Sequence, residues 1–151
     1  MYYKKNNLTI DLDINYKKNW YQKLNKKNWY QKLNKSKLNP PAYVFGPVWT
    51  FLYLSMAFFI YNIISINYTK FLLPLVLFSI QLYFNLIWPT IFFKQNNFSK
   101  AFNYLIITLV FTILTMIETF KINPKISYIL IPYLLWLSLA AYLNYFILKN
   151  N

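Results

Sequence analysis

Four long apolar stretches follow one another along the chain after its first forty residues. They run roughly from Tyr43 to Ile66, from Phe71 to Phe93, from Ala101 to Phe120 and from Ile126 to Leu148. Each has about the 20 mostly apolar residues that a helical membrane span needs, and none shows the period-two polarity of a barrel strand. The short gaps force consecutive helices to run antiparallel as neighbours. The pattern predicts an all-α, multi-pass transmembrane helical bundle with four spans.

The first forty residues have a different character, because they are polar, rich in lysine and without a stretch that could span a membrane or act as a secretory signal. The nine residues 18–26, KNWYQKLNK, are repeated without change at 27–35. A tandem copy this short is not a solenoid unit. We expect residues 1–40 to form a cytoplasmic segment and residues 41–151 to form the transmembrane bundle.

Composition supports a membrane protein, with 58% hydrophobic, 23% aromatic and only 13% charged residues. The net charge of +13 arises from lysine alone, in a chain also crowded with Asn, Ile, Tyr and Phe. Codons rich in A and T would enrich all of these residues together, so the charge does not indicate a nucleic-acid partner. The partner that the composition indicates is the lipid bilayer.

The positions of the lysines predict the orientation in the membrane. Ten of the 16 lysines precede Pro41. If four helices cross in turn, Lys94, Lys100 and Lys149 fall on that same side, and the lysines on the opposite side are Lys70, Lys121 and Lys125. By the positive-inside rule, both termini should face the cytoplasm, where lysines also meet anionic headgroups.

Candidate chemistry is limited by what the sequence lacks. The chain contains no cysteine and no histidine, and its three acidic residues are Asp11, Asp13 and Glu118. We therefore expect no metal site, no resident cofactor and no pair of carboxylates for acid–base catalysis. Glu118 lies within a span, where a carboxylate suggests a functional site. It is also within a turn of the end of that span, where it can reach the interface as a structural residue.

Polar and aromatic residues recur at helical spacing within each span. The four faces are Trp49, Tyr53 and Met56; Gln81, Asn85 and Trp88; Thr108, Thr112, Thr115 and Thr119; and Tyr133, Trp136, Ala140 and Asn144, the last opened by Pro132. Buried amides and hydroxyls can serve as interhelical hydrogen bonds, which is our interpretation of the threonines. For the tryptophan-bearing faces, a ligand pocket and an interfacial aromatic belt both remain open.

The start of the first span is unusual. The sequence PPAYVFGPVWTFLYLSM, from Pro40 to Met56, joins a paired proline to the only glycine of the chain, Gly46, which is followed by Pro47. Such residues can shape a pocket wall. They are equally compatible with a plain helix start, because proline is tolerated in the first turn.

These residues resemble those of a known family. From Trp29 to the C-terminus, about four-fifths of its length, it resembles the TspO/MBR family of tryptophan-rich sensory and translocator proteins. The resemblance runs in order through WYQKLNK (29–35), PPAYVFGPVWTFLY (40–53), QLYFNLIWPTIFF (81–93) and PYLLWLSLAAYLNY (132–145). It implies a bundle of five transmembrane helices, usually dimeric, that binds porphyrins such as protoporphyrin IX, and also sterols and drug-like apolar ligands. We accordingly expect a homodimer in a bacterial membrane.

The resemblance also implies which residues form the pocket. Trp49 and Trp136 match tryptophans linked to porphyrin binding and to light-dependent porphyrin breakdown in bacterial members, and Trp29 matches a third on the covering loop. A flat macrocycle can stack on indole faces, and its propionates can meet lysines near the cytoplasmic surface. The porphyrin is then a ligand and not a cofactor. The full set expected to bind ligand is Trp29, Pro41, Trp49, Tyr53, Gln81, Asn85, Trp88, Tyr133, Trp136, Ala140 and Asn144. A weak sterol-type pattern adds Leu143, Tyr145 and Lys149.

The sequence also departs from the family. Nothing before Trp29 can span a membrane, so we expect four helices where the family has five, with its first helix missing. Ser36, Leu38 and Tyr43 replace a proline and two tryptophans, and Ala57 and Tyr104 replace a glycine and an acidic residue. The leading hypothesis is a membrane protein that binds, transports or senses tetrapyrroles. The alternatives are a light-dependent porphyrin-degrading enzyme, with Trp49 and Trp136 as its reactive residues, and a degenerate member with an incomplete pocket.

Overall fold

The computed structural model describes residues 30, 32–66 and 70–151. The chain divides into two units, residues 1–34 and 35–151, and the helices described below belong to the second. The first copy of the repeat and residues 27–29 and 31 of the second copy, Trp29 among them, lie outside the described residues. The predictions made for them stay predictions.

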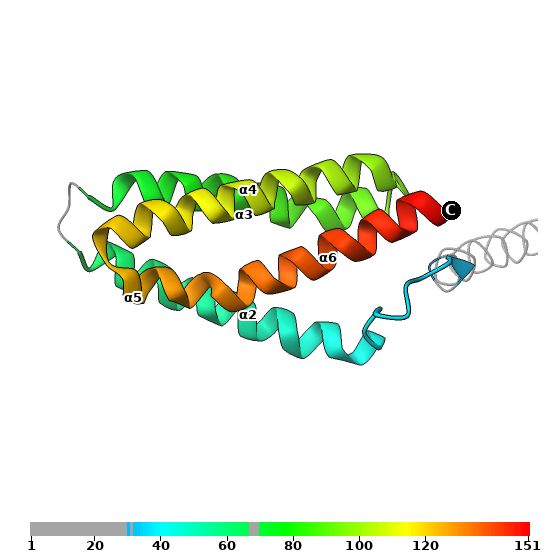
Figure 1. Ribbon diagram of the computed structural model, residues 1–151, viewed down its shortest axis with the longest axis horizontal. Coiled ribbons are helices and arrows are strands. Elements are labelled where there is room, and N and C mark those ends of the chain that lie inside the picture. Colours follow the sequence, from blue (N-terminus) through cyan, green and yellow to red (C-terminus); the bar gives the residue numbers. More distant parts are fainter. Residues whose placement is uncertain (1–29, 31, 67–69) are drawn as a thin grey trace, which may run out of the picture. The chain divides into compact units, whose positions relative to one another are not determined.

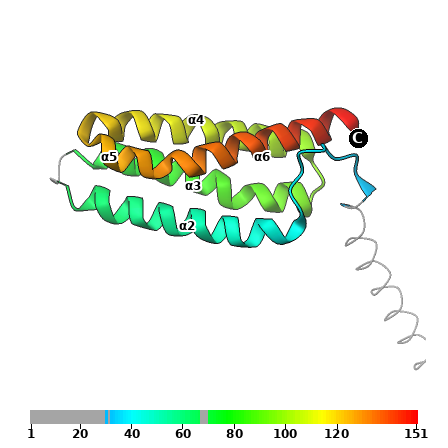
Figure 2. The same ribbon diagram turned by 60° about the horizontal axis from the view of Figure 1, so that its bottom comes forward.

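The described part of the second unit is helical and contains no strand. Its elements are α2 (Ala42–Ile64), α3 (Leu72–Phe93), α4 (Phe98–Ile122), α5 (Pro124–Ser127), a 3-10 turn η1 (Tyr128–Leu130) and α6 (Ile131–Asn150). The long helices lie along a common direction and alternate in sense (Figures 1 and 2). Four segments are long and apolar enough to cross a membrane, the last of them comprising α5, η1 and α6. The predicted all-α bundle with four spans is confirmed.

The last span is not one continuous helix, which differs from the sequence prediction. A short helix and a 3-10 turn precede α6, and Pro132 lies in the first turn of α6. Proline has no N–H, so the carbonyl of Tyr128 cannot receive the usual bond from four residues ahead. The carbonyl instead accepts from the Ile131 N–H, three residues ahead, as in a 3-10 turn.

The helices pair unequally. The closest pairing is between α3 and α4, and α4 also packs along α6, whereas α2 contacts mainly η1 and α5 near its C-terminal end. Towards its N-terminal end α2 diverges from α6 (Figure 1). The α2 residues Leu52, Met56 and Phe59 enter the core, where Phe59 stacks on Phe78 of α3 at 5.3 Å between ring centroids. The backbones of α2 and α6 are therefore farther apart near the start of α2, where long side chains span the gap between the two helices.

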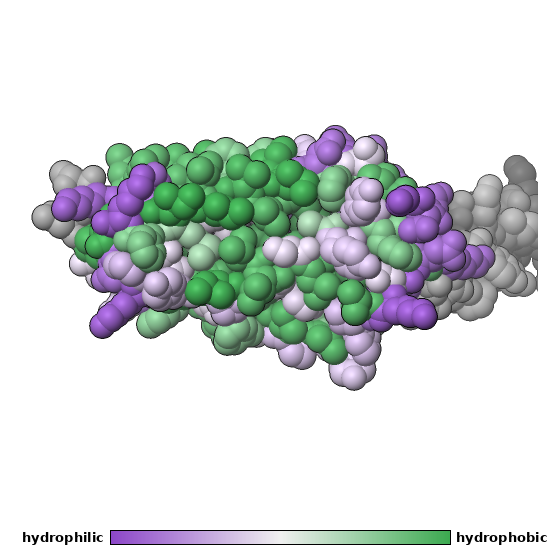
Figure 3. Space-filling view, in the orientation of Figure 1, coloured by the Kyte–Doolittle hydropathy of each residue, from purple (hydrophilic) through white to green (hydrophobic). Residues whose placement is uncertain are grey.

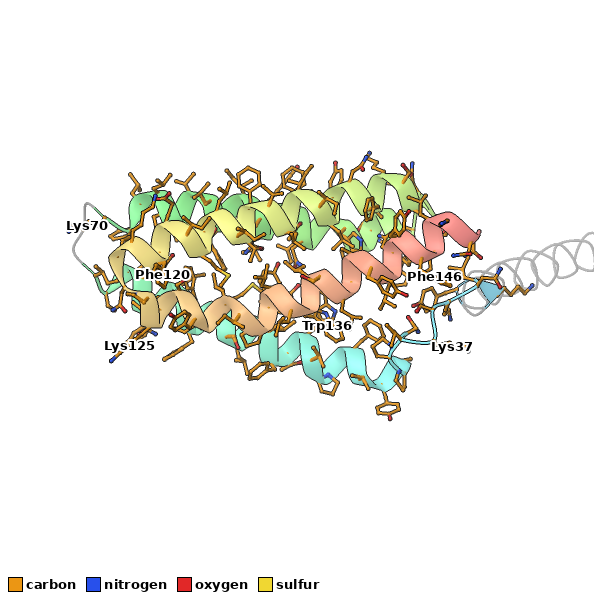
Figure 4. All side chains as sticks on the ribbon, in the orientation of Figure 1. Lys37, Lys70, Phe120, Lys125, Trp136 and Phe146 are labelled. Carbon is orange, nitrogen blue, oxygen red and sulfur yellow. The ribbon has the colours of Figure 1, made fainter. Side chains whose placement is uncertain are left out.

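The surface has the polarity of a membrane protein. Figure 3 shows an apolar band across the helices, with hydrophilic side chains towards both ends of the bundle. Lys94 caps α3, Lys100 lies in the first turn of α4 and Lys149 in the last turn of α6, so these three lie at one end. Lys70 and Lys125 lie at the other end (Figure 4). The chain is therefore an integral membrane protein surrounded by lipid.

Candidate ligand-binding site

An aromatic cluster occupies the place where α2 and α6 diverge. The indoles of Trp49 and Trp136 meet edge to face, with ring centroids 6.5 Å apart. Phe45 approaches the Trp136 ring edge-on at 5.7 Å, and Tyr53 lies 5.6 Å from Trp49. Edge-to-face and tilted contacts in this range are attractive for aromatic rings. Both indoles are only half-buried, so each keeps ring surface that a ligand could cover.

The cluster lies beside the helical core and not within it. On α2 the most buried residues are Leu52, Met56, Phe59 and Ile63, and on α6 they include Tyr133 and Leu137. Trp49 and Trp136 flank these core faces on their respective helices. The structure thus brings together the two tryptophans singled out by the sequence, packed against the edge of the core. Trp136 is labelled in Figure 4.

A shallow apolar groove adjoins the cluster. Its volume is about 360 Å³, and it lies between α2 and α6 with Trp136 in one wall; it is lined by Val48, Phe51, Leu52, Pro132, Leu135, Trp136 and Leu139. Apolar walls with an indole suit a flat, hydrophobic ligand more than a charged one.

Two hydrogen-bonded pairs lie on the inner sides of α2, α3 and α6. The Tyr133 hydroxyl donates to Gln81 Oε1 at 2.7 Å, and the Tyr53 hydroxyl donates to Asn85 Oδ1 at 3.2 Å. Gln81 is 1% exposed, yet its Nε2 has no hydrogen-bond partner among the described residues. Because an unpartnered buried donor costs free energy, this amide is a place where a ligand acceptor would be stabilising.

Trp88 and Asn144 contact each other across the bundle. With its amide oxygen towards α3, Asn144 accepts from Trp88 Nε1 at 3.1 Å, and its amide nitrogen donates to the Phe98 carbonyl at 3.1 Å. The Trp88 ring also stacks on Phe92 at 5.3 Å. These contacts link α3, α4 and α6, so the polar atoms of both side chains are already used within the protein.

The other predicted residues lie apart from the cluster or at its margin. Pro41 is exposed and forms the N-cap of α2. A side chain at Gly46 would meet nothing within 4 Å, so no neighbouring group requires a glycine here. This favours the interpretation of these residues as a plain helix start over a pocket wall. Pro47 lies beyond the first turn, and its missing N–H leaves the Tyr43 carbonyl without its helical donor. Ala140 is half-buried on α6.

The sterol-type residues do not share one surface. Leu143 is buried, whereas Tyr145 is 49% exposed and Lys149 is exposed. The Tyr145 ring instead packs against Phe102 at 5.7 Å.

The threonine face of α4 is buried throughout, although its hydrogen bonds differ from the interhelical pattern expected. The hydroxyls of Thr108, Thr112 and Thr115 donate to carbonyls one turn earlier in α4, at 2.7 to 2.8 Å. In an apolar environment the carbonyl at i−4 is the nearest acceptor. Glu118 pairs with Lys121 at 2.6 Å, one turn before α4 ends, in agreement with a structural role.

Two features of the site were not singled out in the sequence. Phe45 contacts Trp136, and its spacing of four residues from Trp49 was the available signal. Ser36 Oγ approaches the Tyr142 hydroxyl at 3.4 Å and accepts from the Leu38 N–H at 3.2 Å. These contacts fix the segment before α2 against α6, and nothing in the local sequence indicates a pairing across 106 positions.

Comparisons with known proteins give one family and several relatives. The model of the TspO/MBR family matches residues 12–149. A tryptophan-rich protein TspO of Chlorobaculum tepidum is 35% identical over 115 residues, covering 75% of this chain and 73% of the relative. The human translocator protein is 32% identical over 116 residues, covering 75% and 69%. A tryptophan-rich sensory protein of Cereibacter sphaeroides is 29% identical over 132 residues, covering 87% and 77%.

Proposed function

Since the chain belongs to the TspO/MBR family, we propose that it binds a tetrapyrrole such as protoporphyrin IX within the membrane and serves in its transport or sensing. The observation that carries the proposal is the contact between Trp49 and Trp136, 6.5 Å apart across the diverging helices α2 and α6. A macrocycle placed there would exchange lipid contact for two indole faces and the adjoining apolar groove.

A charged group near the cluster would orient the ligand. Protoporphyrin has an apolar macrocycle and two propionates on one edge. Lys37 precedes α2 at the end of the bundle where the cluster opens (Figure 4) and would pair with a propionate. The apolar surface would supply most of the binding free energy, and the charged group would set the orientation of the ligand.

The test is titration of the detergent-purified protein with protoporphyrin IX, followed by quenching of tryptophan fluorescence. Saturable quenching is expected, with an affinity about tenfold weaker in Trp49→Phe and in Trp136→Phe, the fold-change that a loss of about 1.4 kcal/mol of stacking produces. Phe120→Leu, far from the cluster at the opposite end of the bundle, is the matched control and should bind as the unchanged protein does. Linear quenching, identical in all variants, would contradict the proposal and favour a member with an incomplete pocket.

Light-dependent degradation of the porphyrin is the second candidate, because the two indoles contact each other as well as the proposed ligand position. An indole close to a photoexcited porphyrin can exchange an electron with it or with the oxygen species it makes. Illumination of the complex in air should then yield a product, and Trp49→Phe or Trp136→Phe should abolish turnover while substantial binding remains. Losses of turnover that only parallel the losses of binding would argue for binding alone.

Three further expectations accompany this proposal. They are a homodimer, a cytoplasmic location of both termini and a bacterial membrane. The mass of the protein in detergent, after subtraction of bound detergent, distinguishes a dimer from a monomer.

A further inference from the structure

A second apolar groove lies at the opposite end of the bundle from the start of α2. It has a volume of about 430 Å³ and is formed between α4 and the chain that returns through α5 and η1 into α6. We call it the α4–η1 groove; its lining residues are Met116, Ile117, Phe120, Lys121, Ser127, Tyr128 and Ile131. Phe120, one of these lining residues, is labelled in Figure 4.

The groove results from the way the chain reverses direction. α4 ends at Ile122, and Asn123 adopts an extended conformation, with its side chain accepting from the Lys125 N–H at 3.0 Å. The return begins with one short helical turn and a 3-10 turn, so η1 does not pack along α4 as a full helix would. The four groove residues of α4 lie on one face, at positions i, i+1, i+4 and i+5.

The interior of the groove suits an apolar chain. Ser127 Oγ, the polar atom of the floor, already donates to the Met116 carbonyl at 2.8 Å. Phe120 and Tyr128 close one side, with ring centroids 6.1 Å apart. The remaining lining side chains of Met116, Ile117 and Ile131 are aliphatic or a thioether. An occupant of this interior need offer no hydrogen bond.

The rim of the groove is cationic. Lys121 lines it, with 62% of its side chain exposed, and Lys125 lies exposed two residues before Ser127. Glu118 takes one hydrogen bond from Lys121 Nζ at 2.6 Å, and an ammonium group has three donors. The rim therefore keeps a net positive charge and free donors next to an apolar slot, at the depth where a span ends.

We propose that the α4–η1 groove binds one acyl chain of an anionic glycerophospholipid from the adjacent leaflet, with Lys121 and Lys125 holding the phosphate. The apolar interior and the cationic rim match the two ends of such a lipid, and zwitterionic lipids lack the net charge that the rim favours. This inference does not depend on the porphyrin proposal, because the site lies at the other end of the bundle from the indole cluster.

The experiment uses the absence of native cysteine. A single cysteine replaces Ile117 in the full chain and carries a fluorophore, and the protein is placed in vesicles of mixed phosphatidylglycerol and phosphatidylcholine, with brominated acyl chains on one lipid or the other. We expect an about fivefold preference for quenching by brominated phosphatidylglycerol, which corresponds to about 1 kcal/mol for a lysine near the headgroups. The control is Val110→Cys, two turns earlier on the same face of α4, where both lipids should quench equally.

Changes at the rim decide whether the lysines are responsible. Lys121→Gln with Lys125→Gln should abolish the preference at position 117, and the double change to arginine should retain it. Lys94→Gln with Lys100→Gln, at the opposite end of the bundle, should leave it unchanged. Helical circular dichroism and unaltered quenching of a fluorophore at position 110 by either lipid establish that each variant is folded. The proposal would be overturned if the two lipids quench equally in the protein with both lysines. It would also be overturned if the glutamine variant keeps the preference for phosphatidylglycerol.

Discussion

Gln81 shows how one buried side chain can be half satisfied. Its carbonyl oxygen accepts from Tyr133, whereas its amide nitrogen has no partner among the described residues. Both side chains are almost fully buried between α3 and α6. An unpaired buried donor lowers the stability of the folded protein, so the one hydrogen bond that Gln81 does make matters more.

Removal of the Tyr133 hydroxyl should destabilise the bundle. In Tyr133→Phe, Gln81 Oε1 loses its donor and both ends of the amide are then unpaired, so we expect a loss of about 1 to 2 kcal/mol in the free energy of unfolding. Thermal unfolding in detergent measures the change. Tyr128→Phe is the matched control, because Tyr128 is 54% exposed and should tolerate the change. Equal effects of the two substitutions would show that the Tyr133–Gln81 bond is not important for stability.

At the scale of the helix, the threonine face of α4 contains one hydroxyl unlike the others. Thr119 is fully buried, and its Oγ1 has no partner among the described residues. Thr119→Val keeps the shape and removes an unsatisfied group, so it should leave the protein equally stable or raise the free energy of unfolding by up to about 1 kcal/mol. Thr112→Val loses the bond that the Thr112 hydroxyl donates to the Thr108 carbonyl, so it should be less stable than Thr119→Val. Unfolding by denaturant in mixed micelles compares them, and greater damage from Thr119→Val would contradict this account.

The elements themselves were largely predictable from the sequence. Apolar length and the charged gaps located all four spans to within a few residues, because a membrane span must satisfy its own backbone and so has a characteristic length. The break before α6 was missed, although Pro132 was the available signal. Helical spacing also identified Gln81, Asn85 and Tyr133 as inward-facing. It could not show that Trp49 and Trp136 lie beside the core, because periodicity gives the face of a helix but not its neighbour.

At the scale of the whole molecule, the unequal helix pairing is the feature that local sequence least determines. Packing between helices in lipid depends on close van der Waals fit and on a few polar contacts. The contact between Ser36 and Tyr142 and the Trp88–Asn144–Phe98 link join residues far apart in the chain. An amide that faces an indole has the same sequence pattern in a ligand pocket and in an interhelical contact, so the ligand role of Trp88 and Asn144 stays a prediction.

The lysine distribution leads to a prediction about topology. Single cysteines at Lys94 and at Asn150 should react with a membrane-impermeant maleimide from one side of the membrane, and a cysteine at Lys125 from the other, because four helices alternate in sense. Labelling of intact cells and of inverted vesicles distinguishes the sides, and the positive-inside rule predicts that Lys94 and Asn150 face the cytoplasm. Reaction of Lys94→Cys and Lys125→Cys from the same side would contradict the arrangement of spans.

We propose that a porphyrin binds against Trp49 and Trp136, and oxidative mapping of the unmutated protein can locate it. The complex with one equivalent of protoporphyrin IX is illuminated in air, and oxidation of each tryptophan is followed by peptide mass spectrometry. Reactive oxygen made at the ligand acts first on the nearest indoles. The account predicts that Trp49 and Trp136 are oxidised well before Trp88, whose indole N–H is bonded to Asn144. Uniform oxidation of these tryptophans, or earlier oxidation of Trp88, would contradict it.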